Sequence, residues 1–235
     1  MTIGIMGAMV EEIEPLLEFF KEYKTIELAN NRYFLAKYKG CDIVVAYSKI
    51  GKVFASLTAC TMIEKFGIEK LLFSGVAGAI NDSLHIGDLI IASKLCQHDL
   101  DITAFGHPYG YVPEGKVYVE SDEDLRDIAK SVANQKGIEL KEGIIATGDQ
   151  FVADSKRKEW IGKTFKADAL EMEGASVAVV ADALNVPFLV LRSISDAADM
   201  DAGFDFDEFL KSSAKESAEF VIAILGRVIE KSKNK

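Results

Sequence analysis

The chain has 235 residues, of which 49% are hydrophobic and 27% are charged, a composition typical of a globular protein. Its formal net charge of −10 argues against a nucleic-acid binder, which would carry a basic surface, and against docking to an anionic membrane. There is no apolar run of the roughly 18 residues that a membrane-spanning helix needs, and the first residues lack the basic start of a signal peptide. We therefore expect a cytoplasmic protein whose partner is a small molecule, with no nucleic acid and no membrane involved.

Short apolar runs rich in β-branched residues predict strands at 2–6, 32–38, 42–47, 70–74, 89–93, 142–146 and 188–194. Apolar residues at helical spacing predict helices at 10–23, 52–66, 122–135, 174–184 and 206–230. This alternation is typical of a mostly parallel sheet between two layers of helices. Because only four prolines and no linker-like segment interrupt it, we expect one α/β domain over residues 1–235, a three-layer α/β/α sandwich with a mixed, mostly parallel central sheet.

The three cysteines, Cys41, Cys60 and Cys96, lie far apart and form no Cys-x-x-Cys pair. We expect them to be buried free thiols in a reducing compartment, which agrees with the cytoplasm. The longest irregular segment, residues 96–116, contains His98, Asp99 and Asp101. The chain has no His-x-x-x-His motif and no Cys pair at the spacing of a metal site. We therefore expect no metal there, and a loop of this length is typically functional or in contact with a partner.

One glutamate of the first predicted helix lies on the wrong face. At about 100° per residue, Glu12 falls within the apolar face, one turn before Leu16, whereas Glu11 falls on the polar face. Acidic residues in a first turn are favoured by the helix dipole, which is sufficient for Glu11. The same explanation remains open for Glu12, but its inward direction and its place just after a strand favour a ligand site.

Three further carboxylates follow strands. Asp196 ends the apolar run 188–194, where it could also cap a helix or form a turn. Glu171 and Glu173 flank Met172; if residues 170–172 end a strand and Gly174 opens a helix, both lie near the same edge of the sheet.

Carboxylates in different environments at one edge are typical of sites that cleave glycosidic bonds, where one protonates the leaving group and another activates water. A carboxylate can also accept two hydrogen bonds from vicinal ribose hydroxyls. The glycines at 4–7 and 74–78 predict tight turns or a close approach to a ligand, but they complete no dinucleotide or triphosphate motif. On its own, the pattern indicates an acidic site on an α/β sheet.

Seven motifs, in order along essentially the whole chain, resemble the 5′-methylthioadenosine/S-adenosylhomocysteine nucleosidases of the purine nucleoside phosphorylase superfamily. They are GIMGAM at 4–9 followed by Glu11-Glu12, SKIGKV at 48–53, SGVAG at 74–78, DITAFG at 101–106, TGDQF at 147–151, EMEGA at 171–175 and RSISD at 192–196. The resemblance implies a nucleoside phosphorylase-like fold and hydrolysis of an N-ribosyl bond without a cofactor or metal.

The resemblance also implies roles for individual residues. Asp196 would protonate N7 of adenine, Glu12 would activate the attacking water, and Glu173 would hold the ribose 2′- and 3′-hydroxyls. Glu171 then keeps a supporting role, and we predict Arg192, on the strand that carries Asp196, as its partner. The remaining implied contacts are Phe151 stacked on adenine, the Val152 backbone at its edge, Ser195 beside Asp196, Gly78 close to the site, Met172 on the ribose, and Met9, Ile50 and Phe206 around the 5′ group. Ile102, Phe105 and Pro113 would close that pocket from the partner subunit of a homodimer.

Two departures from the family pattern bear on the reaction. Val76 replaces a serine of many members, which removes any hydroxyl contact to the water. The places where the phosphorylases carry phosphate-binding arginines hold residues 9–12 and Phe73 here, and an anionic Glu12 would repel phosphate. Hydrolysis is therefore expected over phosphorolysis.

Two alternatives stay open beside the phosphorylase. SKIGKV at 48–53 and FSGVAG at 73–78 resemble members that also hydrolyse 6-amino-6-deoxyfutalosine in menaquinone biosynthesis, and the sequence does not rank the three substrates. The second alternative is a nucleoside-binding module without turnover, and the presence of all three implied catalytic carboxylates argues against it.

Overall fold

The computed structural model describes residues 1–196 and 206–233, leaving out the side chains of residue 196 and residues 206–209. Its strands are β1 (Thr2–Gly7), β2 (Tyr23–Leu28), β3 (Asn31–Tyr38), β4 (Cys41–Tyr47), β5 (Lys70–Ala79), β6 (Leu89–Gln97), β7 (Val119–Glu120), β8 (Leu140–Thr147), β9 (Ala169–Glu171) and β10 (Phe188–Asp196). Its helices are α1 (Val10–Phe20), α2 (Lys52–Phe66), α3 (Glu123–Lys136), α4 (Ser155–Phe165), α5 (Gly174–Ala183) and α6 (Phe206–Lys233), with a short 3-10 helix at Thr103–Phe105.

The strands form one mixed sheet that partly closes on itself. Strands β4, β1, β5 and β10 run parallel, and β3 and β2 extend the sheet antiparallel at the β4 side. At the other side β10 also pairs with β6, β6 with β8, β8 with β9, and β9 returns to β5. The strands β5, β10, β6, β8 and β9 therefore form a closed ring, and the site described below lies at its edge.

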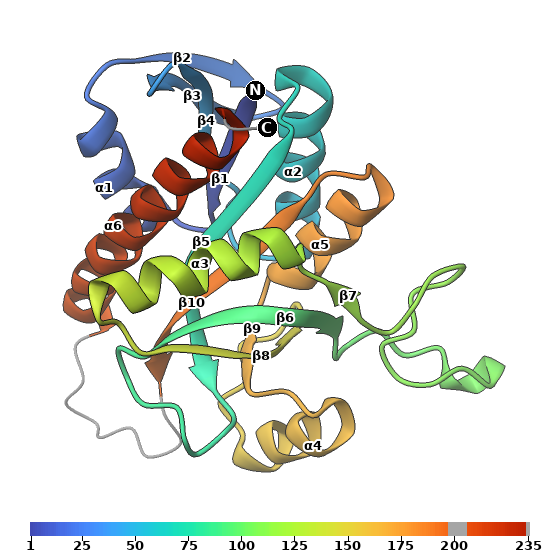
Figure 1. Ribbon diagram of the computed structural model, residues 1–235. Coiled ribbons are helices and arrows are strands. Elements are labelled where there is room, and N and C mark those ends of the chain that lie inside the picture. Colours follow the sequence, from blue (N-terminus) through green and yellow to red (C-terminus); the bar gives the residue numbers. More distant parts are fainter. Residues whose placement is uncertain (197–205, 234–235) are drawn as a thin grey trace.

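Helices cover both faces, which confirms the predicted α/β/α sandwich (Figure 1). On one face α1 and α3 pack against α6, and residues such as Ile5, Leu16 and Leu225 are buried between these helices and the sheet. On the other face α2 packs against α5, with Met6 and Met62 in the core between them and the sheet. Because both faces of β1 are covered, its sequence is almost continuously apolar, as expected for a buried parallel strand.

Several predicted boundaries were wrong. The first helix ends at Phe20 instead of Tyr23, because the residues that follow form β2, an exposed strand at the edge of the sheet that pairs with β3. Helix α4 was not predicted, since it is rich in lysine and buries only Ile161 and Phe165. The expected turn at 74–78 is also wrong: β5 continues to Ala79, paired on one side with β10 and at its end with β9.

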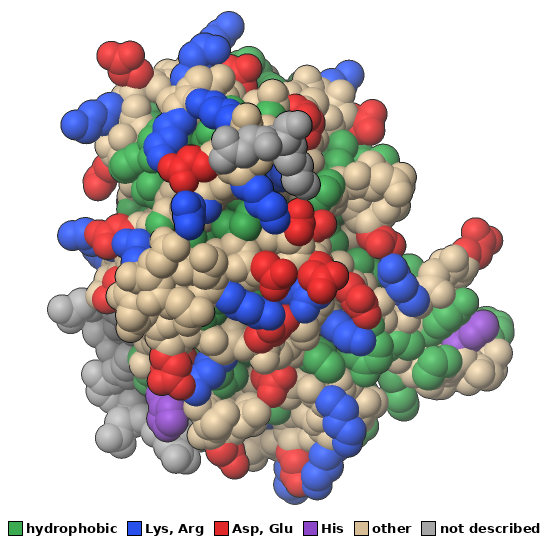
Figure 2. Space-filling model, viewed as in Figure 1, with side chains coloured by type: hydrophobic (Ala, Val, Ile, Leu, Met, Phe, Trp, Pro, Cys, Tyr) green, Lys and Arg blue, Asp and Glu red, His purple; other side chains and the backbone are tan. Residues whose placement is uncertain are grey.

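Cys41 and Cys96 are buried free thiols as expected, whereas Cys60 is exposed on α2, so the prediction was wrong for this residue. Among the helices of the described ranges, none combines the length and apolar character required to cross a bilayer. The segment between β6 and β7 projects from the body as an arm (Figure 1), and apolar side chains gather along it (Figure 2).

Candidate active site

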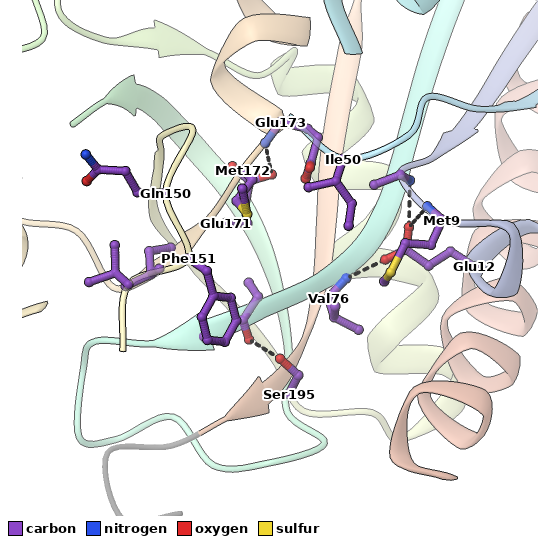
Figure 3. Close-up of a pocket in the computed structure, with 15 residues that line it drawn as sticks. Met9, Glu12, Ile50, Val76, Gln150, Phe151, Glu171, Met172, Glu173 and Ser195 are labelled. Carbon is purple, nitrogen blue, oxygen red and sulfur yellow. Dashed lines mark hydrogen bonds between the residues drawn. The ribbon is translucent and has the colours of Figure 1, made fainter. Parts of the chain in front are cut away.

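A cavity of about 240 Å³ lies beside the closed ring, at the ends of β5, β9 and β10. The loops after β1 and β8, the start of α1 and the segment before α2 complete its wall (Figure 3). The residues that line it are Ala8, Met9, Glu12, Ile50, Val76, Ala77, Gly78, Gln150, Phe151, Val152, Leu170, Glu171, Met172, Glu173 and Ser195. The parallel strands β5 and β10 bring their carboxyl ends to one edge, which is where sheets of this class bind ligands, and β9 meets the end of β5 antiparallel.

The predicted residues fall into three groups. Met9, Glu12, Ile50, Gly78, Phe151, Val152, Met172, Glu173 and Ser195 come together around the cavity. The side chains of Asp196 and Phe206 lie outside the described residues, although the backbone of Asp196 ends β10 opposite Gly78. Ile102, Phe105 and Pro113 belong to the projecting arm and are absent from the lining of this cavity.

Glu12 is buried and points into the cavity, as its position on the apolar face of α1 predicted. Its Oε2 accepts hydrogen bonds from the backbone N–H groups of Ala8 (2.6 Å) and Met9 (3.0 Å), and its Oε1 accepts one from Val76 (3.1 Å). Burial raises the pKa of Glu12, and the charge of Arg192 and these three hydrogen bonds oppose the rise without cancelling it. A carboxylate with a raised pKa is suited to take a proton from water near neutral pH.

Gly75 makes room for this carboxylate. A Cβ atom at this position would lie 2.9 Å from Oε1 of Glu12 and 3.2 Å from Nη1 of Arg192. The glycine that looked like a turn signal is therefore a strand residue required by the close approach of two buried side chains.

Glu171 has a structural role, and its predicted partner is confirmed. Its Oε2 accepts from Nη2 of the buried Arg192 at 2.6 Å and from the N–H of Gly174 at 2.7 Å. Its Oε1 accepts from the hydroxyl of Thr147. Arg192 also lies 4.1 Å from the centre of the Phe73 ring. Through its contacts with Thr147, Arg192 and Gly174, Glu171 connects β9 to β8, β10 and the first turn of α5 at the base of the site.

Glu173 differs from Glu171 because it forms no ion pair with a Lys or Arg side chain of the described residues. Its side chain is buried and its Oε1 accepts one hydrogen bond, from the N–H of Gly51 at 2.8 Å. Burial and the charges of Glu171 and Glu12 raise the pKa of Glu173 to about 8, against the lowering effects of Arg192 and the Gly51 N–H. A buried carboxyl with spare acceptor capacity beside the cavity fits a ligand that brings its own donors.

At the other side of the cavity, Phe151 presents a ring that is 80% exposed, which is unusual for a large apolar side chain. Ser195 lies where the pairing of β10 with β5 shifts register, and its hydroxyl donates to the carbonyl of Ala77 at 3.3 Å. Ala8, Ala77, Gln150 and Leu170 also line the cavity and were not predicted. Three of them are small or apolar, so their residue type carried no chemical signal.

Among residues 1–196 and 206–233, no cluster of three or more His, Cys, Asp or Glu side chains is arranged to hold a metal ion. Asp99, which the sequence placed near two other possible ligands, is instead paired with Lys52 at 2.7 Å.

Comparisons with known proteins agree with this geometry. Residues 2–226 match the model of the Phosphorylase superfamily. The chain is 58% identical to the aminodeoxyfutalosine nucleosidase of Campylobacter jejuni over 94% of this chain and 97% of that protein. It is 36% identical to the 5′-methylthioadenosine/S-adenosylhomocysteine nucleosidase of Actinobacillus succinogenes over 97% of this chain and 100% of that protein.

Among solved structures, the crystal structure of the Campylobacter jejuni 5′-methylthioadenosine/S-adenosyl homocysteine nucleosidase superposes with a TM-score of 0.95 at 57% identity. The match covers 97% of this chain and 99% of that chain. This chain therefore belongs to the Phosphorylase superfamily and, within it, to the family of 5′-methylthioadenosine/S-adenosylhomocysteine and aminodeoxyfutalosine nucleosidases.

Proposed function

We propose that this protein hydrolyses the N9–C1′ bond of 5′-methylthioadenosine, S-adenosylhomocysteine and 6-amino-6-deoxyfutalosine, releasing adenine and the ribose product. The names of the relatives at 58% and 36% identity support these substrates. Because the three share the adenosine part and differ in the 5′ substituent, one site can act on the same bond in each.

The observation that carries the proposal is the buried Glu12 carboxyl, fixed by three backbone N–H groups at the edge of the cavity. In this position it takes a proton from water while the water oxygen forms a bond to C1′. The N9–C1′ bond breaks at the same stage, its electron pair moves to the base, and Asp196 supplies the proton at N7. Protonation makes adenine a neutral leaving group, which lowers the barrier to its departure.

Glu173 and Phe151 hold the two parts of the substrate. The free acceptor capacity of Glu173 suits the ribose 2′- and 3′-hydroxyls, and its negative charge stabilises the cationic character that develops on the sugar. The exposed Phe151 ring suits stacking on adenine. Met172, Ser195 and the Val152 backbone adjoin these contacts, and we assign the cavity residues Met9 and Ile50, together with Phe206, to the 5′ group.

Hydrolysis is favoured over phosphorolysis by charge. Glu12 and Glu173 both line the cavity, and an anionic carboxylate at the nucleophile position repels phosphate. The purified protein should release adenine from 5′-methylthioadenosine in a buffer free of phosphate, measured by chromatography of the free base. A strict phosphate requirement would indicate a phosphorylase, and the absence of free adenine at any substrate would indicate a binding module.

The order of substrate preference is tested by kcat/KM for the three nucleosides measured side by side. Asp196→Asn serves as the inactive reference, because an amide retains the shape of the side chain but cannot deliver the proton. Turnover close to that of the unmodified protein in this variant would remove Asp196 from its role.

We further propose a homodimer in which Ile102, Phe105 and Pro113 of one subunit complete the cavity of the other. Phe105 is 80% exposed on the projecting arm, and α2 exposes Val53 and Leu57 close in sequence to the cavity residue Ile50. Exposed apolar side chains of this size favour an interface. We also propose that the protein works in the cytoplasm, where its free thiols Cys41, Cys60 and Cys96 would remain reduced.

The shared cavity can be tested by complementation. Phe105→Asp and Asp196→Asn should each be inactive alone, but a mixed dimer contains one cavity with an intact Asp196 and an intact Phe105 from its partner. Activity should therefore reappear on mixing, up to about a quarter of the original if subunits exchange at random. A fully active monomer in analytical ultracentrifugation, or no recovery from a verified mixed dimer, would contradict the proposal.

A further inference from the structure

Three segments beside the cavity are tied together by a closed set of hydrogen bonds, which we call the Asp99–Lys52–Asp149 ring. Oδ1 of Asp99 accepts from Nζ of Lys52 at 2.7 Å, and Oδ2 of Asp99 accepts from the backbone N–H of Asp149 at 2.8 Å. Oδ1 of Asp149 in turn accepts from the backbone N–H of Lys52 at 2.8 Å. The ring therefore joins the segment after β6, the loop after β8 and the first residue of α2.

The Lys52–Asp99 ion pair of the ring is largely shielded from water, unlike most ion pairs of the described residues, whereas Asp149 is exposed. The side chains of Lys52 and Asp99 are 18% and 14% exposed, whereas those of the Lys37–Asp42 pair are 84% and 62% exposed. Nζ of Lys52 also donates to Oε1 of Gln97 at 3.1 Å. Shielded, charge-assisted hydrogen bonds hold geometry more strongly than exposed ones.

Two members of the ring, Lys52 and Asp149, lie within two positions of the cavity residues Ile50 and Phe151. Gly51, directly before Lys52, donates its N–H to Glu173, and Phe151 follows Asp149 by two positions. Helix α2 has no capping side chain of its own, and Asp149 supplies the missing acceptor at its first N–H. Gly51 has φ of +100°, and a Cβ there would lie 3.1 Å from Oδ1 of Asp149, so a glycine is needed for both the backbone and the approach of Asp149.

We propose that the Asp99–Lys52–Asp149 ring positions both ends of the nucleoside site at once, fixing the Gly51 N–H against Glu173 at the ribose end and the loop of Phe151 at the base end. Asp99, Lys52 and Asp149 are thus positioning residues, and none of them lines the cavity. This inference rests on the proposed function, because it assigns the two ends by the roles of Glu173 and Phe151.

The ring predicts a pH effect whose direction separates positioning from simple charge. Glu173 must be ionised to accept both ribose hydroxyls, and the charged groups that act on it are Glu171, Glu12 and Arg192. Asp99→Asn removes a negative charge, which by electrostatics alone would lower the pKa of Glu173. If the ring positions Gly51, the same variant weakens the Gly51 hydrogen bond and raises that pKa instead.

The experiment measures kcat/KM for 5′-methylthioadenosine against pH in Asp99→Asn and Lys52→Met, with Asp42→Asn as the exposed control. We expect a loss of about tenfold or more, mainly in KM, and an ascending limb moved to higher pH in both ring variants. The control should match the unmodified protein. A limb that moves to lower pH in Asp99→Asn, or unchanged kinetics in both ring variants, would overturn the proposal.

A second measurement does not depend on turnover. Amide hydrogen exchange of the peptide containing Gly51 should be faster in Asp99→Asn and in Lys52→Met than in the control, because the Gly51 N–H loses its fixed acceptor. Unchanged exchange in both would overturn the positioning role even if activity falls. If the unmodified protein releases no adenine, the proposed function fails, while this exchange experiment still decides whether the ring holds Gly51.

Discussion

Replacing Glu173 by glutamine should stabilise the protein while it removes activity. The folded state raises the pKa of this carboxyl from 4.5 to about 8, chiefly by burial, so the folded state holds the proton more tightly than the unfolded chain. The stability connected with that proton is fully present below about pH 4.5 and is lost as the pH rises through about 8. At about 1.4 kcal/mol for each pH unit, the loss is about 3 kcal/mol at pH 7 and approaches about 5 kcal/mol above pH 8.

Glu173→Gln does not titrate, and its amide oxygen can still accept from the Gly51 N–H. The difference in free energy of unfolding between the variant and the unmodified protein should therefore grow in favour of the variant from pH 5 to pH 8. Denaturant unfolding at several pH values measures it directly, and a gain of about 3 kcal/mol at pH 7 corresponds to roughly 6–12 °C in Tm for a chain of this size.

Glu142→Gln is the matched control with the opposite sign. Burial raises the pKa of Glu142, but the hydrogen bonds and charges of Lys130 and Arg126 outweigh burial and lower it. This glutamate therefore stabilises the folded state above the unfolded pKa, and the stabilisation is lost as the pH falls through its lowered folded pKa. Its replacement should cost of order 1 kcal/mol or less at neutral pH. A difference for Glu173→Gln that stays flat from pH 5 to pH 8 would refute the burial argument.

Three further substitutions test the rest of the site. Arg192→Met should lower the free energy of unfolding by about 3–5 kcal/mol, because Glu171 is left buried without its cation. In denaturant unfolding, the double variant with Glu171→Gln should recover part of that lost stability, and additive losses would show that the pair is not coupled. Phe151→Ala should leave Tm unchanged, since the ring is 80% exposed, and should raise KM about tenfold in steady-state assays; an unchanged KM would exclude stacking on the base. Glu12→Gln should lower kcat about a hundredfold or more with an unchanged circular dichroism spectrum, and near-normal turnover would assign the base to another group.

Glu173 shows how function and stability oppose each other at this site. Its burial and its two carboxylate neighbours raise its pKa and are unfavourable for folding at neutral pH, whereas ribose hydroxyls that donate to it would favour its ionised form. Glu171, two residues earlier, has the same side chain but is paired with Arg192 and serves the scaffold. The environment of each carboxyl, and not its residue type, assigns the role.

Sequence periodicity alone determined a substantial part of this protein. The alternation of strands and helices predicted the layers, and the helical spacing placed Glu12 on the buried face of α1. The Glu171–Arg192 pair was predicted with the help of the family resemblance, which assigned Glu173 to the ribose; a buried carboxylate needs a partner, and Arg192 lies on the strand that carries Asp196. These inferences succeed because they depend on local spacing and on the cost of burying a charge.

Only the tertiary structure decided how distant segments meet. The ring of strands closes through the pairing of β9 with β5 and of β10 with β6, and no local propensity encodes these registers. The hydrogen bond from the Val76 N–H to Glu12 joins residues 64 positions apart. The hydrogen bond from the Gly51 N–H to Glu173 joins residues 122 positions apart. Backbone donors look the same at every position of a sequence, so their use at a site depends on strand register and helix placement, which the packing of the whole chain sets.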